Sequence, residues 1–284
     1  MISSELSAFK RNVTSQNGED GIIEEIFRRI KPNHRIAVEF GAWDGIYLSN
    51  TYNLWANEHW KAYLIEADKE KFEILKQNTF NFPHVTPINA WVGLSEEDKL
   101  DTLLSKYDIP ADFDLLSIDV DGNDYYIFQS LENYSPTLII VEFNFTIPLP
   151  LELIQKPGEY FGASAMAMYN LAKLKGYELC CISGGNLFFV RSDRFKELGI
   201  PSVDLSKVFP YEFLCHVISA YDGRLFLTKK PIFKNQLSHK TQFLYREKIL
   251  FRLGRFSIFL RYKRKAKENP AGNHVNLIPV EIIT

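Results

Sequence analysis

The sequence predicts an α/β fold with a mostly parallel, seven-stranded sheet and helices on both of its faces. Short apolar segments rich in Ile, Leu and Val alternate with longer amphipathic segments, as in sheets that are buried on both faces. A Ser-Gly-Gly-Asn turn at 183–186 lies between the last two strand candidates and predicts that the sheet ends in an antiparallel hairpin. With 284 residues, 46% of them hydrophobic, the chain is long enough for one such domain and an appendage.

The elements follow in order along the chain. The first predicted helix carries its apolar residues on one face: Ile22, Ile23, Ile26, Phe27 and Ile30. Ser15 or Asn17 is placed to cap this helix. Strands are expected at 35–40, 62–65, 85–90, 113–118, 137–143, 177–182 and 187–191. Further helices are expected at 50–58, 69–78, 100–107, 124–131 and 163–175, with Gly176 at the end of the last.

Three regions are expected from this pattern. Residues 1–34 form a helical lead-in, residues 35–195 form the main domain, and residues 196–284 form an extension in which the alternation fades. Within the extension, 244–267 mixes apolar residues with many Lys and Arg residues and is typical of a basic amphipathic helix. Such a helix either packs on the main domain with a solvated basic face or docks to an anionic membrane surface.

Charge and cysteine usage narrow the functional classes. A formal net charge of -2 gives no reason to expect a nucleic-acid binder. Cys180 and Cys181 are neighbours in a predicted strand and are poorly placed to bridge each other. Residues 1–11 lack the apolar segment of a signal peptide, and no apolar run reaches the roughly 20 residues of a membrane span. We therefore expect a cytoplasmic protein, with a peripheral position at the inner face of the membrane left open by the basic segment.

A glycine-containing turn closes the first predicted strand and reads Glu-Phe-Gly-Ala-Trp-Asp-Gly at 39–45. In an open α/β sheet, this turn borders the ligand cleft. Gly41 and Gly45 would let the backbone approach a ligand, and Glu39 could accept a hydrogen bond from an ammonium group such as that of methionine. A dinucleotide would instead require Gly-x-Gly-x-x-Gly.

A second acid, Glu66, ends the next predicted strand about 20 residues after Gly45, the position from which an acid binds ribose hydroxyls. Asn89 and Ala90 end the third strand and are expected to border an adenine ring. An acid-led turn followed by a ribose-binding acid predicts S-adenosylmethionine as the cofactor and a methyltransferase as the function.

Oxygen-bearing side chains also end the fourth and fifth strands. Asp119 and Asp121 follow the fourth strand, and Glu142 and Asn144 follow the fifth. We expect either Asp119 or Asp121 to act as a general base, or Asp119, Glu142 and Asn144 to hold a divalent cation such as Mg²⁺ or Mn²⁺. An alternative interpretation makes Asp121 and Asp124 parts of a turn with a helix cap.

Over residues 15–191 the chain resembles the FkbM-like family of S-adenosylmethionine-dependent methyltransferases. The matching segments are Ser-Gln-Asn-Gly-Glu-Asp at 15–20, the turn at 39–45 with Asn-Thr at 50–51, Leu-Ile-Glu-Ala-Asp at 64–68, Asp-Leu-Leu-Ser-Ile-Asp-Val-Asp-Gly-Asn-Asp at 114–124, Ile-Val-Glu-Phe-Asn at 140–144, Gly-Ala-Ser at 162–164 and Asn-Leu-Phe-Phe-Val-Arg at 186–191. The resemblance implies a Rossmann-like class I fold and O-methylation of a hydroxyl on a sugar, glycan or related metabolite. The cofactor-binding residues expected from all these motifs are Gln16, Glu39, Gly41, Gly45, Asn50, Thr51, Glu66, Ala67, Asn89, Ala90 and Asp119.

The methyl acceptor, a small molecule or a glycan, stays open, because many members of the family have Asp-Val-Glu-Gly where this chain has Asp-Val-Asp-Gly at 119–122. Asp119 and Asp121 also resemble the Asp-x-Asp signature of metal-dependent glycosyltransferases and phosphohydrolases. Such phosphohydrolases carry the pair after the first strand, whereas here it follows the fourth. A non-catalytic binding module is a further alternative, against which the joint presence of Glu39, Glu66 and Asp119 argues.

Overall fold

A computed structural model of the protein describes residues 4–219, 221, 225–229 and 280–282. The chain divides into two compact units, Met1–Glu212 and Phe213–Thr284. The second unit contains a three-stranded sheet formed by β8 (Val217–Ser219), β9 (Leu225–Leu227) and β10 (Val280–Ile282). The predicted basic helix at 244–267 lies outside the described residues.

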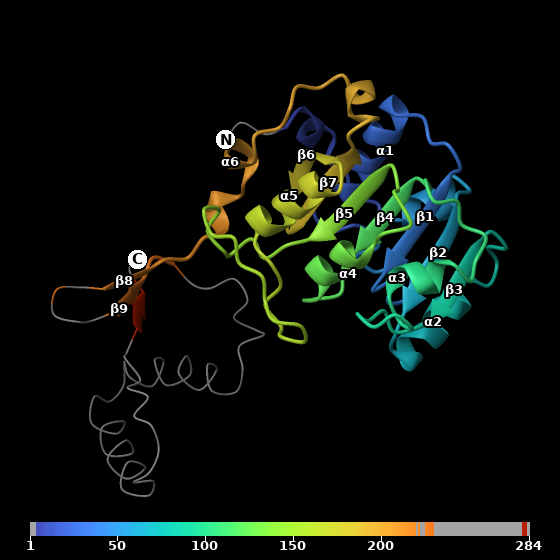
Figure 1. Ribbon diagram of the computed structural model, residues 1–284, viewed down its shortest axis with the longest axis horizontal. Coiled ribbons are helices and arrows are strands. Elements are labelled where there is room, and N and C mark those ends of the chain that lie inside the picture. Colours follow the sequence, from blue (N-terminus) through green and yellow to red (C-terminus); the bar gives the residue numbers. More distant parts are fainter. Residues whose placement is uncertain (1–3, 220, 222–224, 230–279, 283–284) are drawn as a thin grey trace, which may run out of the picture. The chain divides into compact units, whose positions relative to one another are not determined.

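The first unit is built on a seven-stranded sheet with the order β3-β2-β1-β4-β5-β7-β6 (Figure 1). The strands are β1 (Ile36–Phe40), β2 (Lys61–Glu66), β3 (Val85–Asn89), β4 (Leu115–Ile118), β5 (Leu138–Glu142), β6 (Tyr177–Ser183) and β7 (Asn186–Arg191). The first five strands pair in parallel, and β7 is antiparallel to both β5 and β6. The predicted mostly parallel sheet with its hairpin is confirmed.

Helices cover both faces of this sheet (Figure 1). They are α1 (Glu19–Arg29), α2 (Lys69–Thr79), α3 (Leu100–Leu104), α4 (Asp124–Ser130), α5 (Ala165–Leu174) and α6 (Leu205–Val208), with the short turns η1 (Glu5–Phe9), η2 (Asn53–Asn57), η3 (Phe195–Leu198) and η4 (Tyr211–Phe213). The helix predicted at 50–58 is only the single turn η2. The helical hydrogen bonds begin at the carbonyl of Thr51, which accepts from the amides of Leu54 and Trp55, while the Asn50 amide and the Thr51 hydroxyl donate to Glu39.

The start of α1 differs in part from the prediction. Gly18 occupies the N-cap position with a left-handed backbone. The hydroxyl of Ser15 nevertheless accepts a hydrogen bond from the first-turn amide of Asp20 at 3.1 Å, as expected for Ser15, whereas Asn17 donates to the carboxylate of Glu19. Asp20 also turns its carboxylate back to the preceding loop and accepts hydrogen bonds from the three successive amides of residues 13–15 at 2.7 to 3.0 Å. The first-turn acid fixes the loop ahead of the helix rather than the helix end itself.

The segments before and after the main domain belong to its core. Leu6 and Ile22 are buried in the same cluster as the strand residue Leu115, and so is Leu198. Phe209 packs against Phe143 with 6.2 Å between ring centroids. Residues 196–212 thus pack with the sheet, and the first compact unit ends at Glu212, later in the chain than the predicted boundary after residue 195.

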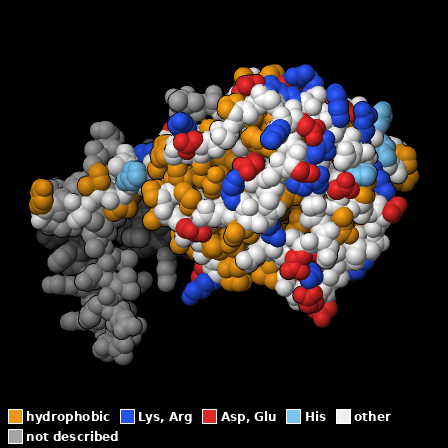
Figure 2. Space-filling view, turned by 45° about the horizontal axis from the view of Figure 1, so that its top comes forward, with side chains coloured by type: hydrophobic (Ala, Val, Ile, Leu, Met, Phe, Trp, Pro, Cys, Tyr) orange, Lys and Arg blue, Asp and Glu red, His pale blue; other side chains and the backbone are white. Residues whose placement is uncertain are grey.

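On the surface of the first unit, Lys, Arg, Asp and Glu side chains are interspersed, and hydrophobic side chains gather on part of the face shown in Figure 2. Residues 1–212 nevertheless contain 31 Asp and Glu against 19 Lys and Arg, so the formal net charge of -2 belongs to the whole chain and not to this unit. Among the described residues, no helix combines the length and the apolar character that crossing a membrane requires.

The buried carboxylate of Glu25 supports a prediction about stability. Arg28 donates two hydrogen bonds to it at 2.6 and 2.8 Å, and Arg29 donates one at 2.6 Å. The Arg28 bonds hold the pKa of Glu25 at about 2, below its ordinary value of 4.5. We expect Glu25→Gln to lower the free energy of unfolding at pH 7 by roughly 1–2 kcal/mol. The expected loss is this small because Arg28 is exposed and solvent screens its charge.

Because the folded-state pKa is lowered, the stabilising effect is complete above pH 4.5 and is lost as the pH falls toward 2. The difference in Tm between wild type and Glu25→Gln should therefore be present at pH 7 and narrow at pH 3, as thermal unfolding followed by circular dichroism would show. Glu24→Gln is the control, since Glu24 and its partner Arg11 are both about half exposed. An equal loss of Tm at both pH values would contradict the charge effect.

Candidate active site

The candidate site lies along one edge of the sheet, where the strands β1, β2, β4 and β5 end. Strand order reverses between β1 and β4, which makes this point the topological switch of the sheet. The acids Glu39, Glu66, Asp119 and Glu142 all stand at these strand ends. The β6–β7 turn reaches the same edge, because the amide of Phe143 donates to the carbonyl of Gly185 at 2.8 Å.

Glu39 is a buried acid on β1 that holds the segment 49–51 by hydrogen bonds. It accepts hydrogen bonds from the Ser49 hydroxyl at 2.7 Å, the Asn50 amide at 2.8 Å and the Thr51 hydroxyl at 2.6 Å. Burial raises the pKa of Glu39. The side chain of Asn50 in turn donates to Ser117 on β4 at 3.0 Å. Glu39, Asn50 and Thr51 therefore form one buried network at the switch point, while their contact with a cofactor stays a prediction.

The two glycines of the 39–45 turn are required by the fold itself. Both adopt positive φ angles, 64° at Gly41 and 80° at Gly45. A Cβ atom at Gly41 would lie 2.0 Å from the carbonyl oxygen of Asp119, and one at Gly45 would lie 2.7 Å from a methyl group of Leu75. The protein's own backbone and core thus occupy the space that a side chain would need, and the approach of this turn to a ligand stays a prediction.

Glu66 ends β2 with both carboxylate oxygens turned to backbone amides. One oxygen accepts from Trp43 at 2.9 Å and the other from Asp68 at 2.7 Å. A carboxylate has about four acceptor positions, so each oxygen keeps capacity for another donor. Asn89 on β3 donates to the carbonyls of Glu66 at 2.8 Å and Ala67 at 3.3 Å, with Ala90 next to it in the chain. The structure thus brings together the residues predicted to bind the ribose and the adenine.

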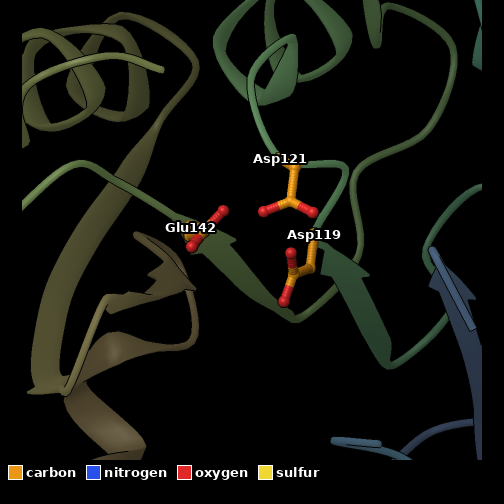
Figure 3. A group of neighbouring side chains, drawn as sticks. All are labelled: Asp119, Asp121 and Glu142. Carbon is orange, nitrogen blue, oxygen red and sulfur yellow. The ribbon is translucent and has the colours of Figure 1, made fainter. Parts of the chain in front are cut away.

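Asp119, Asp121 and Glu142 form a group that we call the acidic cluster. Each contributes a carboxylate oxygen, and these oxygens all lie within 4.8 Å of one another. Figure 3 shows the three carboxylates turned toward a common point from the end of β5 and from the loop after β4. Asp121 has a left-handed backbone with a φ of 53°, a costly conformation for a residue with a side chain that is typical of functional sites.

The neighbouring Asp124 has the structural role that was considered for this turn. It is buried and accepts hydrogen bonds from the amides of Val120 at 2.9 Å and Gly122 at 2.8 Å. Burial raises its pKa to about 6. The turn interpretation therefore applies to Asp124, which fixes the loop, whereas Asp121 belongs to the acidic cluster.

The electrostatics of the acidic cluster are dominated by like charges. Asp119 and Asp121 are exposed and Glu142 is half-buried, and the surrounding protein removes much of the hydration of Asp119. Burial raises the pKa of both Asp119 and Glu142, and the charges of neighbouring carboxylates raise them further. Among the described residues, no Lys or Arg is one of the main influences on the pKa of Asp119 or Glu142. Such a set either shares protons or attracts a cation.

Asn144 does not join the acidic cluster. Its side-chain oxygen accepts from the amide and the hydroxyl of Thr146 at 2.9 and 2.5 Å, and its amide donates to the Phe161 carbonyl at 2.8 Å. With both lone pairs of that oxygen in use, Asn144 is not available as the predicted metal ligand. Asp121, predicted only as a catalytic residue, takes the third place beside Asp119 and Glu142.

The N-terminal segment also reaches this edge of the sheet. Thr14 donates to the carbonyl of Ser49 at 3.1 Å, and Ser183 donates to the carbonyl of Asn17 at 2.6 Å. Gln16 lies between these two anchors with its side chain exposed. The predicted cofactor residue Gln16 is therefore held close to the 49–51 segment and to the β6–β7 turn.

Sequence reasoning missed Glu19 as a member of this region. Glu19 is fully buried and accepts hydrogen bonds from the Asn17 amide at 2.5 Å and from the Asn186 side chain at 3.2 Å. Its charge is one of those that raise the pKa of Asp119. An acid in the first turn of an amphipathic helix is ordinarily a solvated dipole partner, so the sequence carried no signal of its burial.

Comparison with known families supports the methyltransferase assignment. The family model described as the methyltransferase FkbM domain matches residues 95–160, the stretch that contains the whole acidic cluster. No curated protein matches the chain.

Three solved structures are similar to this chain in fold. The citrinin polyketide synthase CMeT domain is 13% identical with a TM-score of 0.42, covering 61% of this chain and 51% of that one, so the chain spans about half of its length. The N-terminal domain of EvdMO1 with SAH bound is 11% identical with a TM-score of 0.41, covering 63% and 80%. TrmK of M. capricolum in complex with S-adenosyl-homocysteine is 12% identical with a TM-score of 0.39, covering 87% and 93%.

The family match and the geometry concern the same residues. The matched segment 95–160 includes β4, β5 and the loop from which Asp119 and Asp121 project. The strand order, with its reversal between β1 and β4 and its antiparallel β7, is the one expected from the resemblance. The resemblance to the FkbM family of S-adenosylmethionine-dependent methyltransferases is therefore confirmed by the match over residues 95–160.

Proposed function

We propose that the protein is an S-adenosylmethionine-dependent O-methyltransferase whose acceptor is a hydroxyl on a sugar, a glycan or a related metabolite. The observation that carries this proposal is the common edge on which Glu66 and the acidic cluster stand. The strands β2, β1, β4 and β5 are direct neighbours, so the ribose-binding acid and the acids suited to proton removal lie along one edge of the sheet.

The residues at this edge fit the cofactor by their charge. S-adenosylmethionine carries an ammonium and a sulfonium cation, and the edge offers the carboxylates Glu39, Glu66 and Asp119. In this proposal Glu66 holds the ribose hydroxyls, and Asn89 and Ala90 border the adenine. When bound there, the cofactor supplies an electrophilic methyl group.

Asp119 is the proposed base for the acceptor hydroxyl. A carboxylate whose pKa is raised toward neutrality is a better proton acceptor than an ordinary aspartate. Asp119 would take the proton of the hydroxyl while the oxygen bonds to the methyl carbon and the bond from that carbon to sulfur breaks, which releases S-adenosylhomocysteine; Glu142 and Asp121 would share the transferred proton with Asp119. In a second version of the same chemistry, the acidic cluster holds a divalent cation that lowers the pKa of the hydroxyl.

Two measurements test the proposal. Isothermal titration calorimetry should detect binding of S-adenosylmethionine, and failure to bind at millimolar concentration would refute it. Incubation with methyl-labelled cofactor and a panel of methyl glycosides should give a labelled methyl ether. Label found only on amines would contradict the choice of a hydroxyl acceptor.

The base and cation versions are separated by chelation. Extensive treatment with EDTA should reduce turnover more than tenfold if a cation is required, and Mg²⁺ or Mn²⁺ should restore it. Full turnover after chelation would exclude the cation version and leave Asp119 as the base.

Glu66 gives the most direct test of the cofactor position. Glu66→Gln should weaken the binding of S-adenosylmethionine by about 10- to 100-fold, because charge-assisted hydrogen bonds to two ribose hydroxyls are lost. Calorimetry measures the dissociation constant, and Glu70→Gln, an exposed acid at the start of α2, serves as the control. A dissociation constant within twofold of wild type would place the ribose elsewhere.

A further inference from the structure

A loop over residues 155–162 borders the acidic cluster and is held together by one buried side chain. Gln155 is only 1% exposed. Its side-chain oxygen accepts from the amides of Phe161 at 2.7 Å and Gly162 at 2.5 Å, and its side-chain nitrogen donates to the Glu159 carbonyl at 2.5 Å. Because one side chain closes the loop onto its own backbone at three points, we call 155–162 the clamped loop.

The clamped loop rests on the turn that carries Asp121. The Tyr126 hydroxyl on α4 donates to the Gln155 carbonyl at 2.7 Å, and the Gly158 amide donates to the side chain of Asn123 at 3.1 Å. A Cβ atom at Gly122 would lie 3.0 Å from the Glu159 carbonyl oxygen, so the turn and the loop are in close backbone contact. Asp121 and the clamped loop are therefore fixed relative to each other.

The other side of the clamped loop is tied to the end of β5. Asn144, two residues beyond Glu142, donates to the Phe161 carbonyl at 2.8 Å. Ile154 forms a bridge with Ala163, next to the loop ends. The loop thus connects the two strand ends that supply the acidic cluster, and this gives Asn144 a role in place of the predicted metal ligation.

Tyr160 is the residue that the clamped loop presents beside the acidic cluster. Burial raises the pKa of its phenol, and the neighbouring carboxylate of Asp121 raises it further through its charge and as a hydrogen-bond acceptor. Its side chain is nevertheless 67% exposed, so most of the ring is free for contact with another molecule. An exposed ring with a fixed polar end, next to carboxylates, suits a ligand that has both an apolar face and hydroxyl groups.

The chemistry of the region favours a neutral ligand. The charges that act most strongly on Asp119 and Glu142 are those of other carboxylates. In the base version, in which no cation neutralises the acidic cluster, a phosphorylated or carboxylated acceptor would meet like charges at short range, which is unfavourable where the protein removes much of the hydration of these charges. A neutral sugar ring fits both the exposed tyrosine ring and the acidic cluster, since its C–H groups pack on an aromatic face and its hydroxyls donate to carboxylates.

We propose that Tyr160 is a positioning and specificity residue for the methyl acceptor. Its phenol donates to Asp121 and orients that carboxylate toward the acceptor hydroxyl, and its exposed ring packs against the face of a neutral sugar. This inference rests on the proposed O-methyltransferase function and adds to it the class of acceptor and the residue that selects it.

Steady-state kinetics of Tyr160→Ala and Tyr160→Phe test the inference on the full chain, with methyl glycosides as acceptors. Tyr160→Ala should raise the KM for the glycoside about 10-fold or more, with the dissociation constant of S-adenosylmethionine unchanged. Tyr160→Phe should keep a KM close to that of wild type, because the ring remains, and should lower kcat about 3- to 10-fold, because Asp121 loses its donor. Tyr211→Ala, which removes another half-exposed ring, is the control.

The outcomes separate this inference from the function on which it rests. If the wild type methylates glycosides and Tyr160→Ala has a KM and a kcat within twofold of the wild-type values, the role of Tyr160 is overturned and the proposed function is left intact. Cofactor binding with no methyl transfer to any glycoside would overturn both. A kcat/KM for a sugar phosphate equal to that for the neutral glycoside would contradict the neutral acceptor class, which predicts at least a tenfold preference for the neutral compound.

Discussion

Replacing Asp119 with Asn is expected to lower kcat for methyl transfer by about 10²- to 10⁴-fold, the contribution of a positioned general base. The substitution keeps the size of the side chain and its place after β4, but an amide neither removes a proton nor neutralises a cation. Asp119 is also the member of the acidic cluster that terminates an apolar, fully buried strand. Single-turnover transfer of a labelled methyl group measures the effect.

Two controls make this result specific. Asp112→Asn removes a carboxylate that pairs with His34 on the surface at 3.0 Å and should leave kcat within about twofold. Calorimetry should show that Asp119→Asn still binds S-adenosylmethionine, which separates chemistry from loss of the cofactor. A variant with wild-type kcat would remove Asp119 from both the base and the cation versions of the mechanism.

The pH dependence of kcat/KM of the wild type should also reflect the ionisation of Asp119. Burial raises the pKa of Asp119, and a base acts only when it is deprotonated. In the base version, kcat/KM should therefore fall as the pH drops through this raised pKa, at a pH above the ordinary range of an aspartate. This fall in kcat/KM at low pH should be absent from the residual activity of Asp119→Asn. A wild-type profile that stays flat down to pH 5 would contradict a base with a raised pKa.

The parts of the structure that the sequence predicted well depend on periodic patterns. Buried parallel strands read as apolar runs, and acids that end them stand out, so β1, β2 and β4 and the acids Glu66 and Asp119 were correctly placed at strand ends. Parallel strands end at the same edge of a sheet. The convergence of Asp119 and Glu142 therefore followed from their positions alone, and the structure confirms it.

The parts that the sequence did not predict depend on individual hydrogen bonds. Asn144 is a plausible ligand by residue type, but the neighbouring Thr146 uses both lone pairs of its oxygen. Gln155 gives no motif, because its partners are backbone groups of the loop that follows it. At the start of α1 the sequence indicated Ser15 as a capping residue, but it did not indicate that the N-cap position itself is a left-handed Gly18 or that Asp20 binds the preceding loop. Such local choices are decided by geometry in three dimensions.

The turn after β1 supports the second large prediction, which concerns folding and chemistry together. Gly41 has a φ of 64°, and a Cβ atom there would lie 2.0 Å from the Asp119 carbonyl oxygen, closer than real Cβ atoms come to other atoms. We expect Gly41→Ala to lower the free energy of unfolding by about 2–5 kcal/mol, the sum of a left-handed backbone cost and an overpacking cost. For a unit of this size, thermal unfolding should show a loss in Tm of roughly 5–15 °C.

Gly199→Ala is the matched control for this prediction. Gly199 has almost the same backbone angle, a φ of 65°, but a Cβ atom there would meet nothing within 4 Å. This variant should therefore lose only the backbone cost of about 1–2 kcal/mol, and an equal loss of Tm in the two variants would contradict the clash. Because the clash at Gly41 falls on the carbonyl of Asp119 itself, relief requires that Asp119 move away from β1. The folded fraction of Gly41→Ala should consequently transfer methyl groups more slowly than wild type, whereas folded Gly199→Ala should keep the wild-type kcat.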